Sequence, residues 1–204
     1  MTKIKICGLR RMEDVEYVNS CKPDFAGFVF AESKRKVTID QALNLRNHLA
    51  DEIIPVGVFV NEQTEKVAKL LNDSIIDIAQ LHGDEDAAYI NQLREQMKRG
   101  KLIKAIRVAD AGSLTDCEKI DVDYLLFDTF SLKEYGGTGR RFNWNLISGI
   151  KKPFFLAGGI HSDNVSEAIE QVHPFAVDVS SAVETDGFKD KEKIIEIVTK
   201  VKII

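Results

Sequence analysis

The stretch Lys5-Ile6-Cys7-Gly8-Leu9 decides the fold, because it ends the first predicted strand in a single glycine. Successive strand side chains point to opposite faces, so Lys5 and Cys7 share one face and Ile6 lies on the other. An open doubly wound sheet would place a glycine-rich phosphate fingerprint directly after this strand. Gly8 stands alone there, so an open sheet is less favoured than a closed barrel.

Eight short apolar runs follow one another along the chain, and segments with helical period separate them. The apolar stripe from Val165 to Val172 is one such segment. Eight βα units predict an α/β fold, a (β/α)8 TIM barrel that fills residues 1–204 as a single domain with about eight helices. At 204 residues the chain is short for this fold, which typically takes ~250, so few insertions are expected. The predicted strands are Ile4–Cys7, Phe25–Phe30, Ile54–Val60, Ile76–Leu81, Leu102–Arg107, Tyr124–Asp128, Phe154–Ala157 and Phe175–Val179.

Several connections between these units carry further signals. Helix starts are expected just after Asn61 and at Ser162-Asp163, and Asp163 and Asn164 are expected to cap the seventh helix rather than contact a ligand. The unusually long connection Thr129–Asn143 contains Gly136-Gly137-Thr138-Gly139, a composition that predicts a mobile lid.

Composition excludes several classes of function. The formal net charge is -4 with 29% charged residues, which indicates neither a nucleic-acid face nor a membrane-binding patch. Three cysteines without a CxxC spacing indicate neither a disulfide framework nor a zinc site. A strand that begins at the third residue and the absence of a long apolar run predict a soluble cytoplasmic protein without signal peptide or membrane span.

Polar residues and glycines gather at the ends of the predicted strands. The carboxyl ends of the strands carry the chemistry of (β/α)8 barrels. Because an unpaired polar group inside a barrel costs on the order of 1–3 kcal/mol, their concentration there predicts an active site. The set comprises Cys7, the loop Ser33-Lys34-Arg35, Gln80, His82, Arg107, Asp128, Gly158-Gly159, Asp178 and Ser180-Ser181.

Each member also has a structural interpretation. A lone cysteine such as Cys7 often packs as a small hydrophobic residue, although Lys5 on the same strand face favours a thiolate. His82 alone is equally consistent with an ordinary loop histidine, and Asp128 with a helix cap. Gly158-Gly159 alone is consistent with a tight turn.

The functional interpretation of Gly158-Gly159 is strengthened by the motif at the end of the next predicted strand. Backbone amides after strands seven and eight form the usual phosphate site of this fold. Gly158-Gly159 and Ser180-Ser181 occupy these two positions, so we expect them to bind a phosphate.

The order of these motifs along the chain resembles the phosphoribosylanthranilate isomerase family of tryptophan biosynthesis. The matching pieces span the whole chain, which makes the resemblance specific. They are Lys5-Ile6-Cys7-Gly8-Leu9, Gly27-Phe28-Val29-Phe30 with Ser33-Lys34-Arg35, Val56-Gly57-Val58-Phe59-Val60-Asn61, Gln80-Leu81-His82-Gly83, Leu126-Phe127-Asp128-Thr129, Tyr135-Gly136-Gly137-Thr138-Gly139, Ala157-Gly158-Gly159-Ile160 and Pro174-Phe175-Ala176-Val177-Asp178-Val179-Ser180-Ser181.

The resemblance implies a barrel of the ribulose-phosphate-binding type and an isomerase that carries out an Amadori rearrangement. It would convert N-(5-phosphoribosyl)anthranilate into 1-(2-carboxyphenylamino)-1-deoxyribulose 5-phosphate. The family needs no metal and no cofactor. Its partner is the small-molecule phosphosugar substrate, and its members are monomers or homodimers, so a monomer is expected here.

The resemblance also assigns roles to individual residues. Cys7 is expected to be the general base, Asp128 the general acid, and Arg35 the group that binds the anthranilate carboxylate. The phosphate is expected at Gly158-Gly159 and Ser180-Ser181.

Two further strand-end residues, His82 and Asp178, are expected to contact the substrate. The acid form of Asp128 must persist if it is to protonate the ring oxygen. Since a free thiol titrates near ~8.5 and desolvation raises that value, Lys5 or another cation must outweigh burial at Cys7.

Three positions depart from the family pattern. Asn143 precedes Trp144 where an Asp is general, and Ala31-Glu32-Ser33 lacks a common Pro. Ala182 replaces a Gly after the two serines, and it would be strained if that position requires positive φ.

Two rival functions remain open at this stage. The histidine-pathway isomerase performs the same rearrangement on a different aminoaldose, but it ends its first strand in Asp and has an internal repeat that this chain lacks. A barrel that binds phosphosugars without catalysis would need the phosphate site but neither Cys7 nor Asp128.

Overall fold

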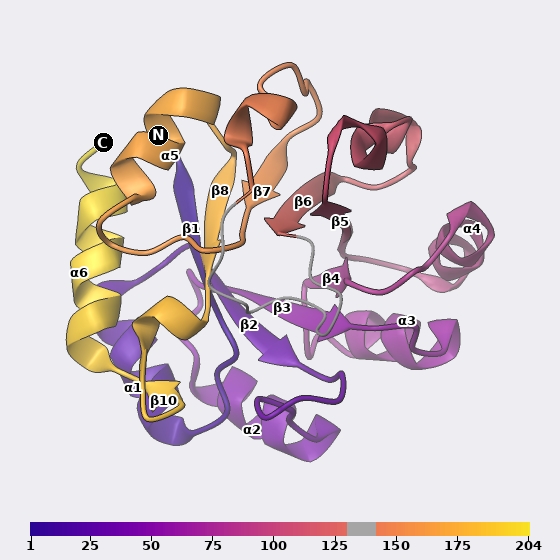
Figure 1. The fold of residues 1–204 in the computed structure, drawn as a ribbon. Helices are drawn as coiled ribbons and strands as arrows, with labels where there is room; N and C mark the ends of the chain where they lie inside the picture. Colours follow the sequence, from indigo (N-terminus) through magenta and orange to yellow (C-terminus); the bar gives the residue numbers. More distant parts are fainter. Residues whose placement is uncertain (130–141) are drawn as a thin grey trace.

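Eight parallel strands close into a barrel in the computed structural model, which describes residues 1–129 and 142–204 (Figure 1). The strands pair in chain order, and the last pairs with the first to close the sheet. The predicted fold class is therefore confirmed, and each strand lies within two residues of its predicted bounds. The strands are β1 (Lys3–Cys7), β2 (Phe25–Val29), β3 (Ile54–Phe59), β4 (Ile78–Leu81), β5 (Lys101–Val108), β6 (Tyr124–Thr129), β7 (Phe154–Leu156) and β8 (Ala176–Val179).

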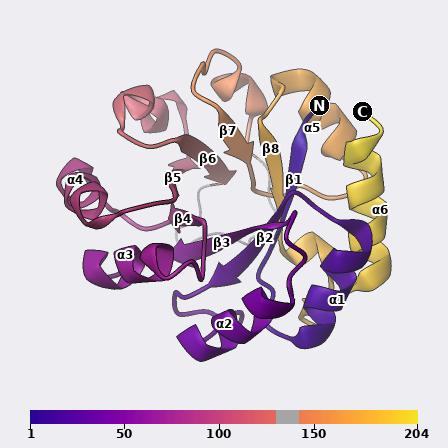
Figure 2. The same ribbon diagram turned by 180° about the vertical axis from the view of Figure 1, so that it is seen from behind.

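Helices surround the barrel, and both termini lie at the same side of it (Figures 1 and 2). The α-helices are α1 (Met12–Cys21), α2 (Ile39–His48), α3 (Thr64–Asn72), α4 (Ala87–Gln96), α5 (Val165–Val172) and α6 (Lys191–Lys202). The described residues after β5 and β6 form only short 3-10 helices, η1 (Ala111–Leu114), η2 (Cys117–Lys119) and η3 (Trp144–Ile147). The expectation of about eight full helices is thus not met by the described residues of these two connections, in which the apolar stripes are too short for an α-helix. The glycines of the expected lid, residues 136–139, lie outside the described residues.

The core has two layers because strand side chains alternate in direction. One set fills the barrel interior and includes Phe25, Val56, Leu126 and Phe155. The other set, which includes Ile6, packs between the sheet and the helices. Lys5 and Cys7 lie on the opposite face of β1 from Ile6, as predicted, and therefore point into the barrel.

Two expected helix starts differ from the structure. α3 begins at Thr64, and Asn61 instead adopts a left-handed backbone (φ 50°) while its Oδ1 accepts a hydrogen bond from the N–H of Asp84 at 2.8 Å. α5 begins after Asn164, whose side chain makes no capping hydrogen bond to the helix. Asn61 binds the loop after β4 and Asn164 binds the loop that precedes α5, because such partners compete with capping of the helix.

A short hairpin follows β8 and was not predicted from the sequence. Its strands are β9 (Glu184–Thr185) and β10 (Phe188–Lys189), and the 3-10 helix η4 (Ser181–Val183) leads into it. The guanidinium groups of Arg10 and Arg11 lie 4.5 and 4.4 Å from the centroid of the Phe188 ring. Such cation–π contacts hold the hairpin against the end of β1.

Among the described residues, no helix combines the length and apolar character needed to cross a membrane.

Candidate active site

Cys7 and its closest charged neighbours lie at the junction of β1 and β8. Lys5 is opposite Asp178 in the ladder between these strands. Its side chain is 0% exposed, and Nζ lies 3.0 and 3.1 Å from the two carboxylate oxygens of Asp178. Burial alone would lower the pKa of Lys5, but the charges of Asp178 and Cys7 outweigh it and the pKa is raised.

The thiol of Cys7 is buried, and burial raises its pKa above the ordinary value. Lys5 opposes the rise, but the carboxylate of Asp178 adds to it. The expected balance, in which a cation outweighs desolvation, is therefore not reached. The physical reason is that desolvation of the buried thiol is the largest effect, and the carboxylate of Asp178 offsets part of the influence of the lysine.

Asp128 occupies the end of β6, where its carboxylate is buried beside a histidine. Its Oδ1 accepts a hydrogen bond from the N–H of Thr129 at 2.7 Å. His82 Nε2 lies 3.3 Å from Oδ2 without the alignment of a hydrogen bond. Gln80 Nε2 lies 2.9 Å from His82 Nδ1, and if the amide donates there the ring proton stays on Nε2, which faces Asp128.

His82 is therefore buried beside Asp128 rather than exposed in a loop. Both His82 and Gln80 are buried at the end of β4, although polar side chains there cost free energy unless they are paired. The prediction that these strand-end residues gather with Asp128 is confirmed by the distances.

The loop after β7 packs directly against the catalytic-acid candidate. Gly158 and Gly159 both have left-handed backbone, with φ of 78° and 72°. A Cβ on Gly158 would lie 2.6 Å from the backbone nitrogen of Thr129 and 2.9 Å from Oδ1 of Asp128. A side chain at this position is incompatible with the observed place of Asp128.

Asn164 fixes this loop, a role that the sequence analysis missed. Its Nδ2 donates to the carbonyl of Gly159 at 2.8 Å, and its Oδ1 accepts from the N–H of His161 at 2.9 Å. The side chain is buried and belongs to the N-cap position of α5. Asn164 is thus the N-cap of α5 as expected, but its amide closes the loop instead of bonding to the helix.

The loop after β8 reaches the catalytic-base candidate. Ser180 Oγ donates a hydrogen bond to the carbonyl of Cys7 at 3.0 Å, and Ser181 opens η4. Ala182 lies inside η4 and does not have positive φ, so the conditional strain at this position does not arise. Asn143 is the N-cap of η3 and accepts from the N–H of Asn145, a role that Asn and Asp fill equally well.

Arg35 lies at the same end of β1, across Gly8. A Cβ on Gly8 would lie 2.5 Å from Arg35 Cδ and 3.4 Å from Ser180 Oγ. The guanidinium binds Glu184 through two hydrogen bonds, and Glu184 also binds Lys189. Neither Glu184 nor Lys189 was singled out from the sequence, because strands of two residues are too short to show a periodic signal.

Arg107, at the end of β5, forms an ion pair with Asp84 of the loop after β4. In the part of the chain that the structure describes, no group of three or more His, Cys, Asp or Glu side chains is arranged to hold a metal ion.

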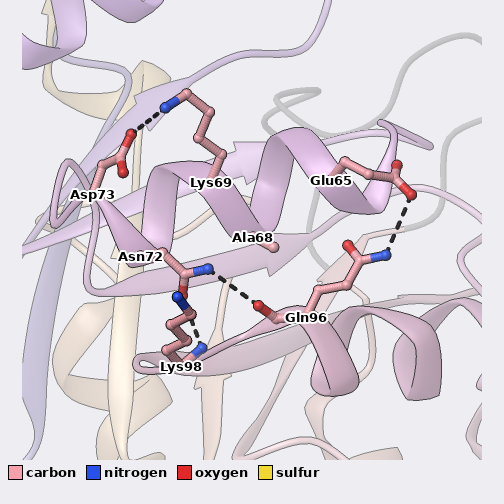
Figure 3. Close-up of a pocket in the computed structure, with 7 residues that line it drawn as sticks. All are labelled: Glu65, Ala68, Lys69, Asn72, Asp73, Gln96 and Lys98. Carbon is pink, nitrogen blue, oxygen red and sulfur yellow. Dashed lines mark hydrogen bonds and ion pairs between the residues drawn. The ribbon is translucent and has the colours of Figure 1, made fainter.

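A separate groove of about 510 Å³ lies between α3 and α4 (Figure 3). Its polar groups bind one another: Lys69 pairs with Asp73 at 2.6 Å, and Asn72 donates to the carbonyl of Gln96 at 3.1 Å. It lies on the helices rather than at the strand ends, and these pairings leave no set of groups poised for chemistry.

Comparison with known proteins places this arrangement among related barrels. The family model described as N-(5'phosphoribosyl)anthranilate (PRA) isomerase matches residues 4–200. A protein of Endomicrobium trichonymphae named N-(5'-phosphoribosyl)anthranilate isomerase is 50% identical over 198 residues, which are 97% of this chain and 97% of that protein. A protein of the same name from Thermoanaerobacter sp. (strain X514) is 48% identical and covers 99% of this chain, with 98% of its own length matched.

Solved structures agree with the sequence matches. The crystal structure of phosphoribosyl anthranilate isomerase from Thermotoga maritima superimposes with a TM-score of 0.89 at 32% identity and 100% coverage of both chains. A complex of such an isomerase with reduced 1-(o-carboxyphenylamino)-1-deoxyribulose 5-phosphate gives a TM-score of 0.86, also at 32% identity and full coverage of both chains.

Proposed function

This chain belongs to the N-(5'-phosphoribosyl)anthranilate isomerase family and catalyses the isomerase step of tryptophan biosynthesis. We propose that Cys7 is the general base and Asp128 the general acid of this reaction. The family resemblance drawn from the sequence is confirmed by these matches. The histidine-pathway isomerase and the non-catalytic barrel are set aside for the same reason.

The order of the strands around the barrel is the observation that carries the proposal. β7 and β8 lie between β6, which ends in the acid candidate, and β1, which ends in the base candidate. A phosphate held by the loops after β7 and β8 would place the attached sugar between Asp128 and Cys7. Positioning of this kind converts a reaction between separate molecules into one within a single complex.

The phosphate would be bound by backbone amides of Gly158-Gly159 and Ser180-Ser181. The left-handed backbone of both glycines lets an anion approach the main chain closely. Arg35 would bind the anthranilate carboxylate, because its planar fork matches a carboxylate better than a lysine does. The complex of the homologous isomerase with a reduced carboxyphenylamino-deoxyribulose phosphate supports a ligand with both anionic groups.

The remaining two site residues would contact the substrate beside the proton carriers. His82, with its Nε2 facing Asp128, would bind a sugar hydroxyl on the β4 side. Asp178 would orient Lys5 toward Cys7 and the sugar on the β8 side.

The rearrangement would proceed in two proton transfers. Asp128 gives its proton to the ring oxygen as the C1–O bond breaks, and the nitrogen lone pair forms an open-chain iminium ion. The thiolate of Cys7 then takes the proton from C2, and the C2–H electron pair forms the enolamine, which tautomerises to the ketone. The iminium charge helps this step, because a nearby cation lowers the pKa of a buried thiol.

The test is turnover of N-(5'-phosphoribosyl)anthranilate by wild type, Cys7→Ser and Asp128→Asn, with Cys117→Ser as the control for a buried thiol elsewhere. We expect Cys7→Ser and Asp128→Asn to lower kcat by a factor of roughly 10² or more, because removing a general base or acid typically costs that much. Cys117→Ser should stay near wild type. A Cys7→Ser enzyme within about threefold of wild type would rule out the thiol as the base.

We further propose that the protein is monomeric and cytoplasmic. Residues 1–204 would form a single domain, and the enzyme would need no cofactor. The isomerase of Thermotoga maritima is described as dimeric, and monomers generated from it have also been solved. Sedimentation at micromolar concentration distinguishes the two states for this chain.

A further inference from the structure

A buried ion pair lies outside the barrel interior, beside the loop that follows β4. Ile103 and Ala105 belong to the interior, so Lys104 between them points to the layer between the sheet and the helices. Its Nζ lies 2.8 Å from Oε2 of Glu85, and the two side chains are only 8% and 0% exposed. A buried ion pair is weak evidence for stability, because desolvation offsets much of its attraction. The groups that this pair binds are therefore more informative than the attraction within it.

The ion pair binds both backbone groups of Gly83. Oε1 and Oε2 of Glu85 accept hydrogen bonds from the N–H of Gly83 at 3.1 and 3.0 Å, and Nζ of Lys104 donates to its carbonyl at 2.8 Å. The glycine is also closely packed, because a Cβ there would lie 2.4 Å from Oδ1 of Asn61 and 2.8 Å from Oε1 of Glu85. The two charged side chains therefore fix the position of Gly83.

Glu85 also joins this loop to the loop after β3. Its Oε1 accepts a hydrogen bond from the N–H of Asn61 at 2.8 Å, and Oδ1 of Asn61 accepts one from the N–H of Asp84 at 2.8 Å. Each loop thus binds the backbone of the other through a side chain. Asn61 keeps a left-handed backbone (φ 50°) in this arrangement, a conformation that persists only where the surroundings hold it.

His82 lies between these bonds and the acid candidate. Its backbone N–H donates to the carbonyl of Phe59, the last residue of β3, at 2.8 Å. Its Nε2 lies 3.3 Å from Oδ2 of Asp128. Because His82 and Gly83 share a peptide unit, a shift of Gly83 would move the backbone of His82 and change the direction of its ring.

These contacts give the ion pair a function at the barrel mouth. We propose that Glu85 and Lys104 are positioning residues that hold the ring of His82 beside the acid candidate. They act through the backbone of Gly83, which both of them bind. The inference rests on the proposed substrate contact of His82.

Two simpler roles for the ion pair make different predictions. If it only stabilised the fold, its removal would lower the free energy of unfolding and leave kcat of the folded enzyme unchanged. If it shaped the whole barrel mouth, its removal would change KM as well as kcat. A positioning role predicts a loss of kcat that depends on the presence of His82.

The test is turnover of N-(5'-phosphoribosyl)anthranilate, combined with urea unfolding to show that each variant is folded. For Glu85→Gln, which keeps the shape and removes the charge, we expect kcat to fall roughly tenfold, as for a misplaced group beside the reacting atoms. KM should stay within about twofold, because loops of other strands would hold the phosphate and the carboxylate. Glu85→Gln combined with Lys104→Met leaves no unpaired buried charge, so this double variant should fold even where the single one does not, with the same loss of kcat.

Asp123→Asn is the matched control. Asp123 pairs with Arg94 of α4 at 2.9 Å and accepts a hydrogen bond from the N–H of Leu102 at 2.8 Å, at the amino end of β5. The amino ends of barrel strands serve stability rather than catalysis. This variant should lower the urea midpoint and leave kcat within about twofold of wild type.

A double-mutant cycle with His82→Asn shows whether the ion pair acts through His82. In the His82→Asn background, Glu85→Gln should lower kcat by less than about twofold more, because the effects of coupled residues do not add. If the two losses multiply, or if KM rises as much as kcat falls, the inference is overturned. A loss in His82→Asn without a loss in either ion-pair variant overturns the positioning role alone. A His82→Asn enzyme with wild-type kcat refutes the assignment of His82 and this inference with it.

Discussion

Replacing Gly158 by alanine tests how tightly the phosphate loop is packed against the acid candidate. Gly158 has φ of 78°, a backbone conformation that costs an L-residue roughly 1–2 kcal/mol. The added Cβ would also lie 2.6 Å from the nitrogen of Thr129 and 2.9 Å from Oδ1 of Asp128. Because a backbone nitrogen cannot rotate away, β6 or the loop has to move.

The chain offers a control that separates these two costs. Gly187 has nearly the same backbone conformation, with φ of 79°, but a Cβ there would meet nothing within 4 Å. Gly187→Ala should therefore lower the free energy of unfolding by the conformational cost only, about 1 kcal/mol. Gly158→Ala should lose that amount plus about 1–3 kcal/mol for overpacking.

Urea unfolding and steady-state turnover measure the two consequences. A displacement of the acid by about 1 Å can cost as much as ~10²-fold in rate, so we expect kcat of Gly158→Ala to fall well below that of Gly187→Ala. Equal stabilities for the two variants would refute the packing of Gly158 against β6. A destabilised Gly158→Ala enzyme with wild-type kcat would refute the dependence of catalysis on the position of Asp128.

The other predictions concern the phosphate site and the two groups with shifted pKa. Gly159→Val should weaken binding of reduced 1-(o-carboxyphenylamino)-1-deoxyribulose 5-phosphate by roughly tenfold or more, because the valine side chain keeps an anion away from the backbone amides. Unchanged affinity in calorimetry would place the phosphate elsewhere. Alkylation of Cys7 by iodoacetamide, taken as the difference between wild type and Cys7→Ser, should still accelerate above pH 9.0, because burial raises the pKa of the thiol above its ordinary value. A plateau near pH 7 would contradict it. The pKa of Glu184 is lowered from 4.5 to about 2, so the stability that it contributes is fully present above pH 4.5 and is lost as the pH falls toward 2. Urea midpoints for Glu184→Gln should fall less steeply than those of wild type across this interval, and identical slopes would disprove the contribution.

The sequence by itself determined the barrel and most of the residues at its mouth. Strand runs and helical stripes arise from local periodicity, which a chain carries in its order of residues. The side chains of Cys7, His82 and Asp128 could be placed together because parallel strands in a barrel end on the same face. The side-chain bonds of Asn61 and Asn164 were misjudged, since Asn61 accepts from Asp84 in another loop and Asn164 donates to Gly159 in the loop that precedes its helix.

Only the tertiary structure decided which charges neutralise one another. Barrel closure buries Cys7 and puts Asp178 beside Lys5, so the lysine lowers the pKa of Cys7 by less than burial raises it. The same closure brings Glu184 to Arg35 across 149 residues. Coulomb energies and desolvation depend on distances and burial, which no local pattern specifies, so the electrostatics of the site exist only once β8 has paired with β1.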